Sequence, residues 1–250
     1  MFIENPFFYL AAIPAVMLYG IAKGGFAGPL AILGVPLMSL VISPIQAAAI
    51  MLPILCIQDL IAVYFYRKKF HFENLKNLIP GALFGIIMGF FWFRYLTESN
   101  IRLLIGLMAL GFVISYCLKS DGIKKSTPSK IKGTFWGSIS GFTSFGIHAG
   151  GLPFNVYMLP QRLDQRVYAG SAALFFCLMN YAKLYPYYLL DQLRVENLYT
   201  SLVLVIFAPI GFFIGYFLTH KVDEKIYYGM AYFGLFMIGL KLTYDGILGL

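Results

Sequence analysis

Charged residues are scarce in this chain: only 12% of its 250 residues are Asp, Glu, Lys or Arg, against about 25% in a typical soluble domain. Apolar residues make up 60% of the sequence. The 19 basic and 11 acidic side chains are too few to cover the surface of a 28.1 kDa globule. This composition excludes an ordinary cytosolic enzyme, a nucleic-acid-binding module and a disordered chain. We therefore predict a polytopic membrane protein.

Cysteine is also scarce, and no catalytic motif accompanies it. Cys56, Cys117 and Cys177 lie far apart, so the sequence holds no Cys-x-x-Cys pair and no disulfide framework. The sequence also lacks the Gly-x4-Gly-Lys-[Ser/Thr] phosphate loop, the His-Glu-x2-His zinc motif and the Gly-x-Ser-x-Gly nucleophile elbow. We therefore expect no enzymatic activity, no cofactor and no metal. Any transport by this chain must use a gradient or downhill flow.

Long apolar runs occupy most of the sequence. A helix needs about 20 apolar residues to cross a bilayer. The residues before the first run lack the basic segment of a cleaved signal peptide, so we expect that run to be retained. Six later runs have the length of one membrane-spanning helix: 44–66, 77–96, 100–118, 167–190, 197–219 and 226–250.

Two other apolar stretches are interrupted by glycine and proline. Residues 7–41 would make a helix of about 52 Å, which is too long for one crossing, and they are cut at Lys23–Pro29. Residues 133–159 are cut at Gly146–Pro153. In both stretches, we expect each piece on either side of the break to be shorter than a span. Broken helices are tolerated at membrane depth only where their backbone is buried in protein or lines an aqueous cavity. Two such segments in corresponding positions indicate the binding site of a transporter.

The chain resembles itself at an offset of 123 residues. Glu73-Asn74-Leu75 then aligns with Glu196-Asn197-Leu198, and Gly28 aligns with Gly151. The lengths of the apolar runs agree throughout the two halves. The alternative is chance similarity between two hydrophobic halves. We therefore predict an internal repeat.

The distribution of basic residues predicts how the halves are oriented. If each interrupted stretch is a hairpin that enters and leaves on one side, one face carries 13 Lys and Arg residues and the other carries three. If each stretch crosses fully, the division is ten against six. The positive-inside rule favours the hairpins, which makes the repeats inverted. We predict an all-α integral membrane protein of two inverted four-element repeats, each with a glycine-broken helical hairpin plus three transmembrane helices: residues 1–118, a cytoplasmic basic linker at 119–132, and residues 133–250.

Glycines at four-residue spacing indicate close helix packing. Gly81-x3-Gly85-x3-Gly89 and Gly211-x3-Gly215 form faces of small residues that let two helices approach closely. We expect these faces to serve packing and to take no part in transport.

Lys23 is the first ionisable candidate, because a charge inside the membrane is costly unless it faces protein or water. It lies at the first hairpin tip, where the amides of Gly24, Gly25 and the half-helix after Gly28 would point at the same space. Bare amides, a helix N-terminus and an ammonium together form an anion site. The alternative is a lysine whose charged end reaches the membrane interface.

His148 is the matching residue at the second hairpin tip, beside Gly150 and Gly151. It could hydrogen-bond an anionic ligand or carry a proton, because histidine titrates near neutral pH. The alternative is a histidine bonded to buried backbone. Weaker candidates nearby are Thr143, Ser144 and Asn155.

Asp59 and Lys183 carry opposite charges at nearly equivalent positions of the two halves. Asn180 lies three residues before Lys183, so both share one face of a helix. Two alternatives stay open: Lys183 helps to bind the substrate while Asp59 serves coupling, or Asp59 and Lys183 form a structural ion pair. In the last run, Lys241 and Asp245 are expected to form a structural pair.

An ordered set of short motifs spans the chain. The first half carries Lys23-Gly24-Gly25-Phe26, Gly34-Val35-Pro36-Leu37, the segment 43–53 and Asp59. The second half carries Gly141-Phe142-Thr143, His148-Ala149-Gly150-Gly151, Leu159-Pro160-Gln161-Arg162, Asn180, Lys183 and Tyr244-Asp245-Gly246. This set resembles the sulfite exporter TauE/SafE family. The resemblance implies a bacterial inner-membrane permease for sulfur-containing or small organic anions, built from two homologous halves.

Together, these features predict a secondary transporter of a small anion that works by alternating access. The resemblance implies that it exports sulfite, sulfonates or related organic anions. The expected partners are a small anionic substrate and the lipid bilayer, without nucleic acid; the oligomeric state is left open, a homodimer included. The alternatives are a channel-like anion pore and a non-transporting membrane scaffold or assembly factor. The residues predicted to bind the substrate are Lys23, Gly24, Gly25, Gly28, His148, Gly150, Gly151, Asn180 and Lys183.

Overall fold

The computed structural model describes residues 3, 5–25, 29–117, 126–218 and 224–249, and within these ranges it contains helices and turns but no strand. The predicted all-α class is therefore confirmed. The elements are α1 (Pro6–Lys23), η1 (Pro29–Leu33), α2 (Gly34–Met38), α3 (Pro44–Phe65), α4 (Phe72–Phe93), α5 (Glu98–Cys117), α6 (Lys130–Ile147), α7 (Gly151–Met158), η2 (Leu159–Gln161), α8 (Gln165–Leu189), α9 (Val195–Leu204), α10 (Phe207–Leu218) and α11 (Glu224–Leu248).

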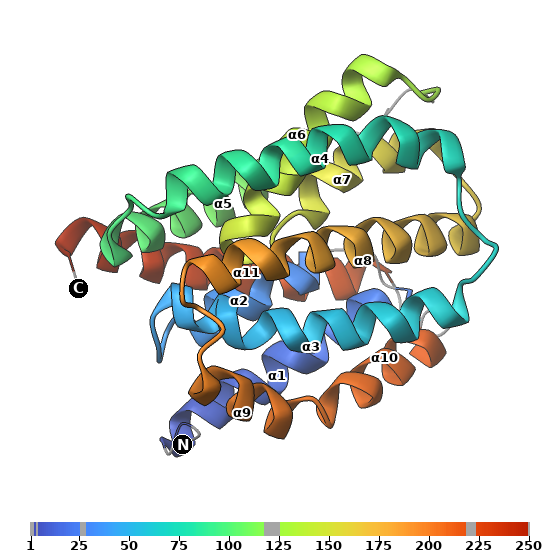
Figure 1. Cartoon of the computed structure of the whole chain (residues 1–250). Helices are drawn as coiled ribbons and strands as arrows, with labels where there is room; N and C mark the ends of the chain where they lie inside the picture. The colour runs from blue at the N-terminus through green and yellow to red at the C-terminus, as the bar shows by residue number, and fades with distance from the viewer. Residues whose placement is uncertain (1–2, 4, 26–28, 118–125, 219–223, 250) are drawn as a thin grey trace.

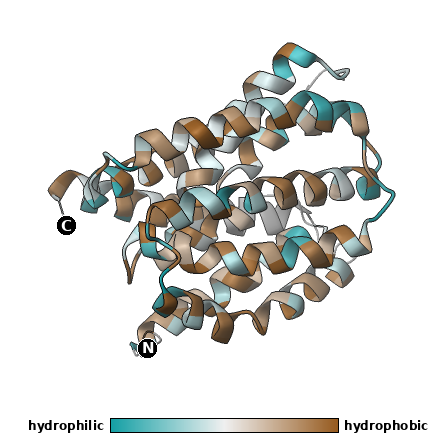
Figure 2. Ribbon diagram, in the orientation of Figure 1, coloured by the Kyte–Doolittle hydropathy of each residue, from teal (hydrophilic) through white to brown (hydrophobic). Residues whose placement is uncertain are grey.

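Several of these helices are suited to a membrane. In the described part of the chain, α1, α3, α4 and α8 are long and apolar enough to cross a bilayer. Large side chains on the outside of α4, such as Phe84 and Trp92, are more than half exposed. Figure 2 shows hydrophobic residues along the helices and hydrophilic residues at connections such as the one between α3 and α4. An apolar outer surface of this kind is expected where helices face lipid.

A fifth candidate span consists of α9 and α10, which are bent by 43° relative to each other. Pro209 explains the break at residues 205–206. It has no amide hydrogen for the carbonyl of Val205, four residues earlier, and its ring collides with that carbonyl in a regular helix.

Both stretches predicted to be interrupted fold back on themselves. After α1 ends at Lys23, Gly25 adopts a φ of 133°, and η1 and α2 then pack against α1. After α6 ends, His148 adopts a left-handed φ of 54°, and α7 packs back against α6. The prediction that every piece is shorter than a span is wrong for α1. Asn5 caps its first turn, and the helix accommodates both Pro14 and Gly20, so it continues for 18 residues, which is long enough to cross.

The two halves of the chain pack against each other through four helix pairs (Figure 1). α1 lies along α10, α4 along α6, α3 along α8 and α5 along α11. The offset of 123 residues relates α1 to α6, α3 to α8, α4 to α9–α10 and α5 to α11. Under this correspondence, the α1–α10 pair is equivalent to the α6–α4 pair. The α3–α8 and α5–α11 pairs each consist of two corresponding helices.

The residues in contact give the helix directions. Met17 lies against Gly211 and Ile21 against Gly215, so α1 and α10 run parallel. By the same criterion, α4 and α6 run parallel, because Asn77 contacts Gly133 and Phe93 contacts Gly146. The other two pairs run antiparallel. Their contacts are Asp59–Asn180 and Tyr66–Gly170 for α3 and α8, and Leu103–Gly246 and Ala109–Gly239 for α5 and α11.

Glycines form the seam between α4 and α6, which confirms the predicted packing face. A Cβ atom at Gly81 or Gly85 would lie 2.0 Å from a carbonyl oxygen of α6, a separation that no side chain tolerates. Similarly, a Cβ atom at Gly215 would lie 2.2 Å from the carbonyl oxygen of Ile21. The facing stripe on α6, Gly133-x3-Gly137-x3-Gly141, has the same four-residue spacing and completes the seam.

We expect Gly85→Ala to destabilise the folded protein by about 1–3 kcal/mol, the usual cost of overpacking. Gly111→Ala is the matched control, because a Cβ atom there meets nothing within 4 Å and alanine favours the helix. Thermal unfolding of the purified variants should give a lower melting temperature for Gly85→Ala and an unchanged or higher one for Gly111→Ala. Equal melting temperatures would contradict the importance of the seam.

Candidate functional site

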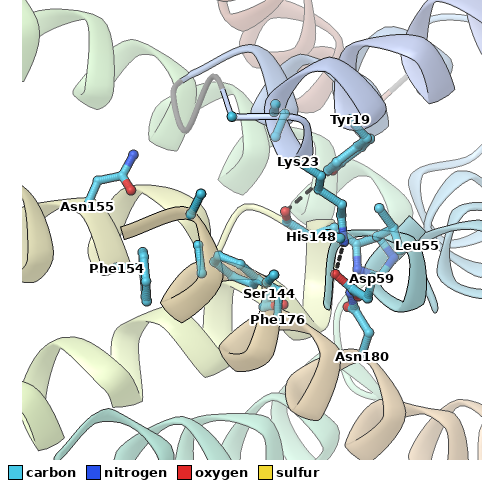
Figure 3. Close-up of a pocket in the computed structure, with 18 of the residues that line it drawn as sticks. Tyr19, Lys23, Leu55, Asp59, Ser144, His148, Phe154, Asn155, Phe176 and Asn180 are labelled. Atoms are coloured by element: carbon cyan, nitrogen blue, oxygen red, sulfur yellow. Dashed lines mark hydrogen bonds and ion pairs between the residues drawn. The ribbon is translucent and has the colours of Figure 1, made fainter. Parts of the chain in front are cut away.

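A cavity lies where both hairpins meet α3 and α8 (Figure 3). It holds about 720 Å³ of space free of protein atoms, its open mouth included. The polar side chains in its lining are Tyr19, Lys23, Asp59, Ser144, His148, Asn155, Tyr168 and Asn180. The cavity is therefore bounded by corresponding elements of the two halves, the hairpin and the helix that follows it.

Lys23 and Asp59 form an ion pair at one end of this cavity. Lys23 comes from the last turn of α1, and Asp59 lies in α3 with no exposed surface. Asn180, from α8, donates its side-chain amide to the second carboxylate oxygen of Asp59 at 2.5 Å. The pair thus joins three helices, and both charges meet the partners that burial requires.

Lys183 is fully buried and has different partners. Its Nζ donates to the carbonyl oxygen of Ser144 at 2.9 Å, to the Ser144 hydroxyl at 3.0 Å and to His148 Nδ1 at 2.7 Å. These acceptors belong to the C-terminal end of α6, where a helix favours a cation. Among the described residues, Asp59 and Lys183 therefore do not form the ion pair that the sequence left open. Asp59 pairs with Lys23 instead, and Lys183 hydrogen-bonds to the C-terminal end of α6.

His148 connects the second hairpin to α3. Its Nε2 lies 3.0 Å from the carbonyl oxygen of Ala48. A carbonyl oxygen only accepts hydrogen bonds, so we assign the ring proton to Nε2, which leaves Nδ1 to accept the hydrogen bond from Lys183. The imidazole also stacks on Tyr187, with ring centroids 6.1 Å apart. His148 is therefore bonded to buried backbone, which was one of the two interpretations that the sequence left open. It also lines the cavity.

The N-terminus of α7 opens onto the cavity. Within the described residues, no hydrogen bond pairs the backbone amides of Gly150, Gly151 and Leu152. Gly151 lines the cavity, and a Cβ atom there would meet nothing within 4 Å. Unpaired amides at the start of a helix favour an anion.

The structure brings five of the predicted binding residues to the cavity wall: Lys23, Gly25, His148, Gly151 and Asn180. Gly24, Gly150 and Lys183 do not line it. A Cβ atom at Gly24 would press into the backbone of α10 at 2.3 Å, and one at Gly150 would lie 2.7 Å from the Ser140 carbonyl oxygen, so both glycines permit close packing. Gly28 lies outside the described residues.

Sequence reasoning missed the apolar part of the wall. Ala169, Ala172, Ala173 and Phe176 lie on one face of α8 and line the cavity together with Phe154. Their spacing, at i, i+3, i+4 and i+7, marks a helical face that continues to Asn180. This signal was present in the sequence, but an apolar face in a membrane helix does not distinguish a ligand from a neighbouring helix.

Comparison with known proteins gives one match. The family model described as Sulfite exporter TauE/SafE matches residues 12–242, nearly the whole chain. Neither the search of curated proteins nor the search of solved structures found a match. The paired hairpin tips, the apolar helices and this match agree on a membrane transport protein, and the chain belongs to the sulfite exporter TauE/SafE family.

Proposed function

We propose that this protein is a secondary transporter that exports a small anion, such as sulfite, a sulfonate or a related organic anion, across the bacterial inner membrane. The observation that carries the proposal is that Lys23 and Gly151, the first residue of α7, line one cavity. A cation on one side and helix-terminal amides on the other suit a ligand with several anionic oxygens. The family match supports the same class of cargo.

Asp59 would then compete with the anion for the ammonium group of Lys23. Lys23 is held by Asp59 in the described conformation, and an entering anion would take over the ammonium while the carboxylate keeps its bond to Asn180. Asp59 would recover Lys23 when the anion leaves. This exchange of partners gives Asp59 the coupling role, and Lys183 holds the tip of the second hairpin in place.

For the transport cycle we propose alternating access between two inverted repeats, residues 1–118 and 133–250, joined by a cytoplasmic linker at 119–132. A two-fold axis lying in the membrane plane turns every helix into an antiparallel copy of itself. The antiparallel α3–α8 and α5–α11 pairs support this relation, and so does the greater number of basic residues on the linker side. A parallel repeat would instead make those helix pairs parallel.

The repeated Glu-Asn-Leu motif supplies contacts suited to such a cycle. The side chain of Asn74, at the start of α4, donates to Gln161 at 2.8 Å, and Gln46 donates to Asn197, at the start of α9, at 3.3 Å. Each bond joins the two halves. Because α4 and α9 follow the C-terminal ends of antiparallel helices, the two contacts lie at opposite ends of the bundle. Opening one face would break one contact and leave the other formed.

Binding of sulfite to the purified protein tests this proposal. We expect Lys23→Ala to weaken binding by about 5- to 150-fold, the equivalent of 1–3 kcal/mol for a charge-assisted hydrogen bond. Lys76→Ala, at an exposed lysine of α4, is the control and should bind as the unaltered protein does. Calorimetric titration in detergent or nanodiscs gives the affinities. Equal affinity for folded Lys23→Ala and Lys76→Ala would remove Lys23 from the site and overturn the proposal.

A further inference from the structure

We infer that the preferred substrate is an organic anion with a compact apolar group, rather than a bare inorganic oxyanion. The inference rests on the proposed function and names the kind of anion that the same cavity would select. It comes from the half of the cavity wall that carries no charge.

The cavity has a charged end, and most of the remaining wall is apolar; Asn155, near Phe154 in Figure 3, and Tyr168, which donates to it, are two uncharged polar side chains in that part. Lys23, Asp59 and Asn180 gather at one end, and Phe154 lies away from them in Figure 3. From α8, Ala169, Ala172, Ala173 and Phe176 line the cavity. Leu55 and Ala62 add an apolar face from α3. A ligand that touches both ends therefore needs an anionic group and an apolar body.

The apolar end is rigid. Phe154 has no exposed surface and stacks on Phe175, with ring centroids 5.0 Å apart. Phe176 packs against the same ring at 5.3 Å. These two buried rings hold Phe176, which is partly exposed to the cavity, so its ring loses little freedom when a ligand arrives. An alkyl or aryl group would lie against the alanines and Phe176, whereas sulfite would leave these side chains against water, which they cannot hydrogen-bond; Asn155 and Tyr168 are the polar groups of this part of the wall.

The homologous series of alkanesulfonates tests the inference. We expect the affinity to rise from sulfite through methanesulfonate and ethanesulfonate to propanesulfonate, by up to about fourfold per methylene, because burial of one methylene is worth about 0.8 kcal/mol. Benzenesulfonate should bind in the same range as propanesulfonate. The affinities would be measured by calorimetric titration of the full-length protein.

Two variants test whether the apolar wall causes the dependence of affinity on the length of the alkyl chain. Phe176→Ala should flatten the dependence on chain length while affinity for sulfite changes little. Ala172→Leu should narrow the cavity, so that propanesulfonate loses affinity more than tenfold and methanesulfonate keeps it. Phe91→Ala, at an outward-facing ring of α4 that is 53% exposed, is the control and should leave the series unchanged.

The outcomes separate this inference from the proposed function. If sulfite binds at least as tightly as propanesulfonate, and Lys23→Ala still weakens its binding, the inference is overturned and the anion transporter stands. If no member of the series binds, the proposed function is overturned together with the inference. If both Phe176→Ala and Ala172→Leu leave the affinities for the alkanesulfonates unchanged, the apolar wall does not contact the alkyl group, and the inference is overturned.

Discussion

Lys183→Met is expected to lower the melting temperature by roughly 4–16 °C and to abolish transport. Lys183 satisfies the carbonyl and hydroxyl oxygens of Ser144 and the Nδ1 atom of His148, in a place without exposed surface. Methionine fills a similar volume but donates no hydrogen bond. Orphaned buried groups cost about 1–3 kcal/mol each in soluble proteins and less inside membranes. We therefore expect a total of about 2–4 kcal/mol, and each kcal/mol shifts a melting temperature by roughly 2–4 °C in a chain of this size.

Arg194→Met is the matched control for Lys183→Met. Arg194 pairs with Asp191 at 2.8 Å, and both side chains are exposed, by 64% and 77%. Removing one member of an exposed pair should cost less than about 1 kcal/mol. The predicted pair of Lys241 with Asp245 is formed at 2.5 Å, but Asp245 is buried, so Lys241→Met would leave a buried carboxylate without its cation. Melting curves and uptake into liposomes measure both effects. If Lys183→Met melts like the control and yet loses anion binding, Lys183 contacts the substrate and its structural role is wrong.

Asp59→Asn is expected to tighten anion binding about tenfold and to slow transport by a similar factor. The substitution keeps the shape of the side chain but removes the charge that holds Lys23. The anion then no longer competes with a carboxylate for the ammonium, so affinity rises. Release slows for the same reason, because no carboxylate is present to take Lys23 back. Calorimetric titration and counterflow in liposomes would measure the two changes.

Asp191→Asn controls for the loss of a carboxylate. Asp191 pairs with Arg194 at 2.8 Å, and its side chain is 77% exposed, so both affinity and counterflow should stay unchanged. Weaker binding in folded Asp59→Asn would show that Asp59 orients Lys23 toward the anion and does not compete with it. Unchanged binding would remove the ion pair from the transport cycle.

The sequence predicted the helices and their interruptions well, because both depend on local composition. Apolar runs of span length became α3, α4 and α8, and the glycine-rich segments after Lys23 and Ile147 became the turns of two hairpins. The length of α1 was underestimated, because the helix begins at Pro6, directly after its cap at Asn5, and continues through Lys23, where the sequence predicted the break.

The sequence also marked the residues of the site more reliably than their partners. Lys23, His148 and Asn180 were candidates because polar groups in apolar runs are costly, and all three line the cavity. Asp59 and Lys183 were placed at similar positions along their helices, yet position along an axis does not fix the direction in which a side chain points. Rotation about the axis turns Lys183 toward α6 and Asp59 toward α1 and Asn180.

The sequence by itself thus determined the helical class, the two broken segments and the glycine seams, all of which follow from hydrophobicity and backbone freedom over a few neighbouring residues. Only the tertiary structure decided which glycine face meets which helix, which cation neutralises Asp59, and that Phe154 and Phe176 close a cavity whose charged end lies at Lys23. Those outcomes depend on contacts between residues far apart in the chain, such as Gly81 with Thr134 and Asp59 with Asn180. Such contacts are selected by shape and charge at the interface between the two halves, and no local pattern records them.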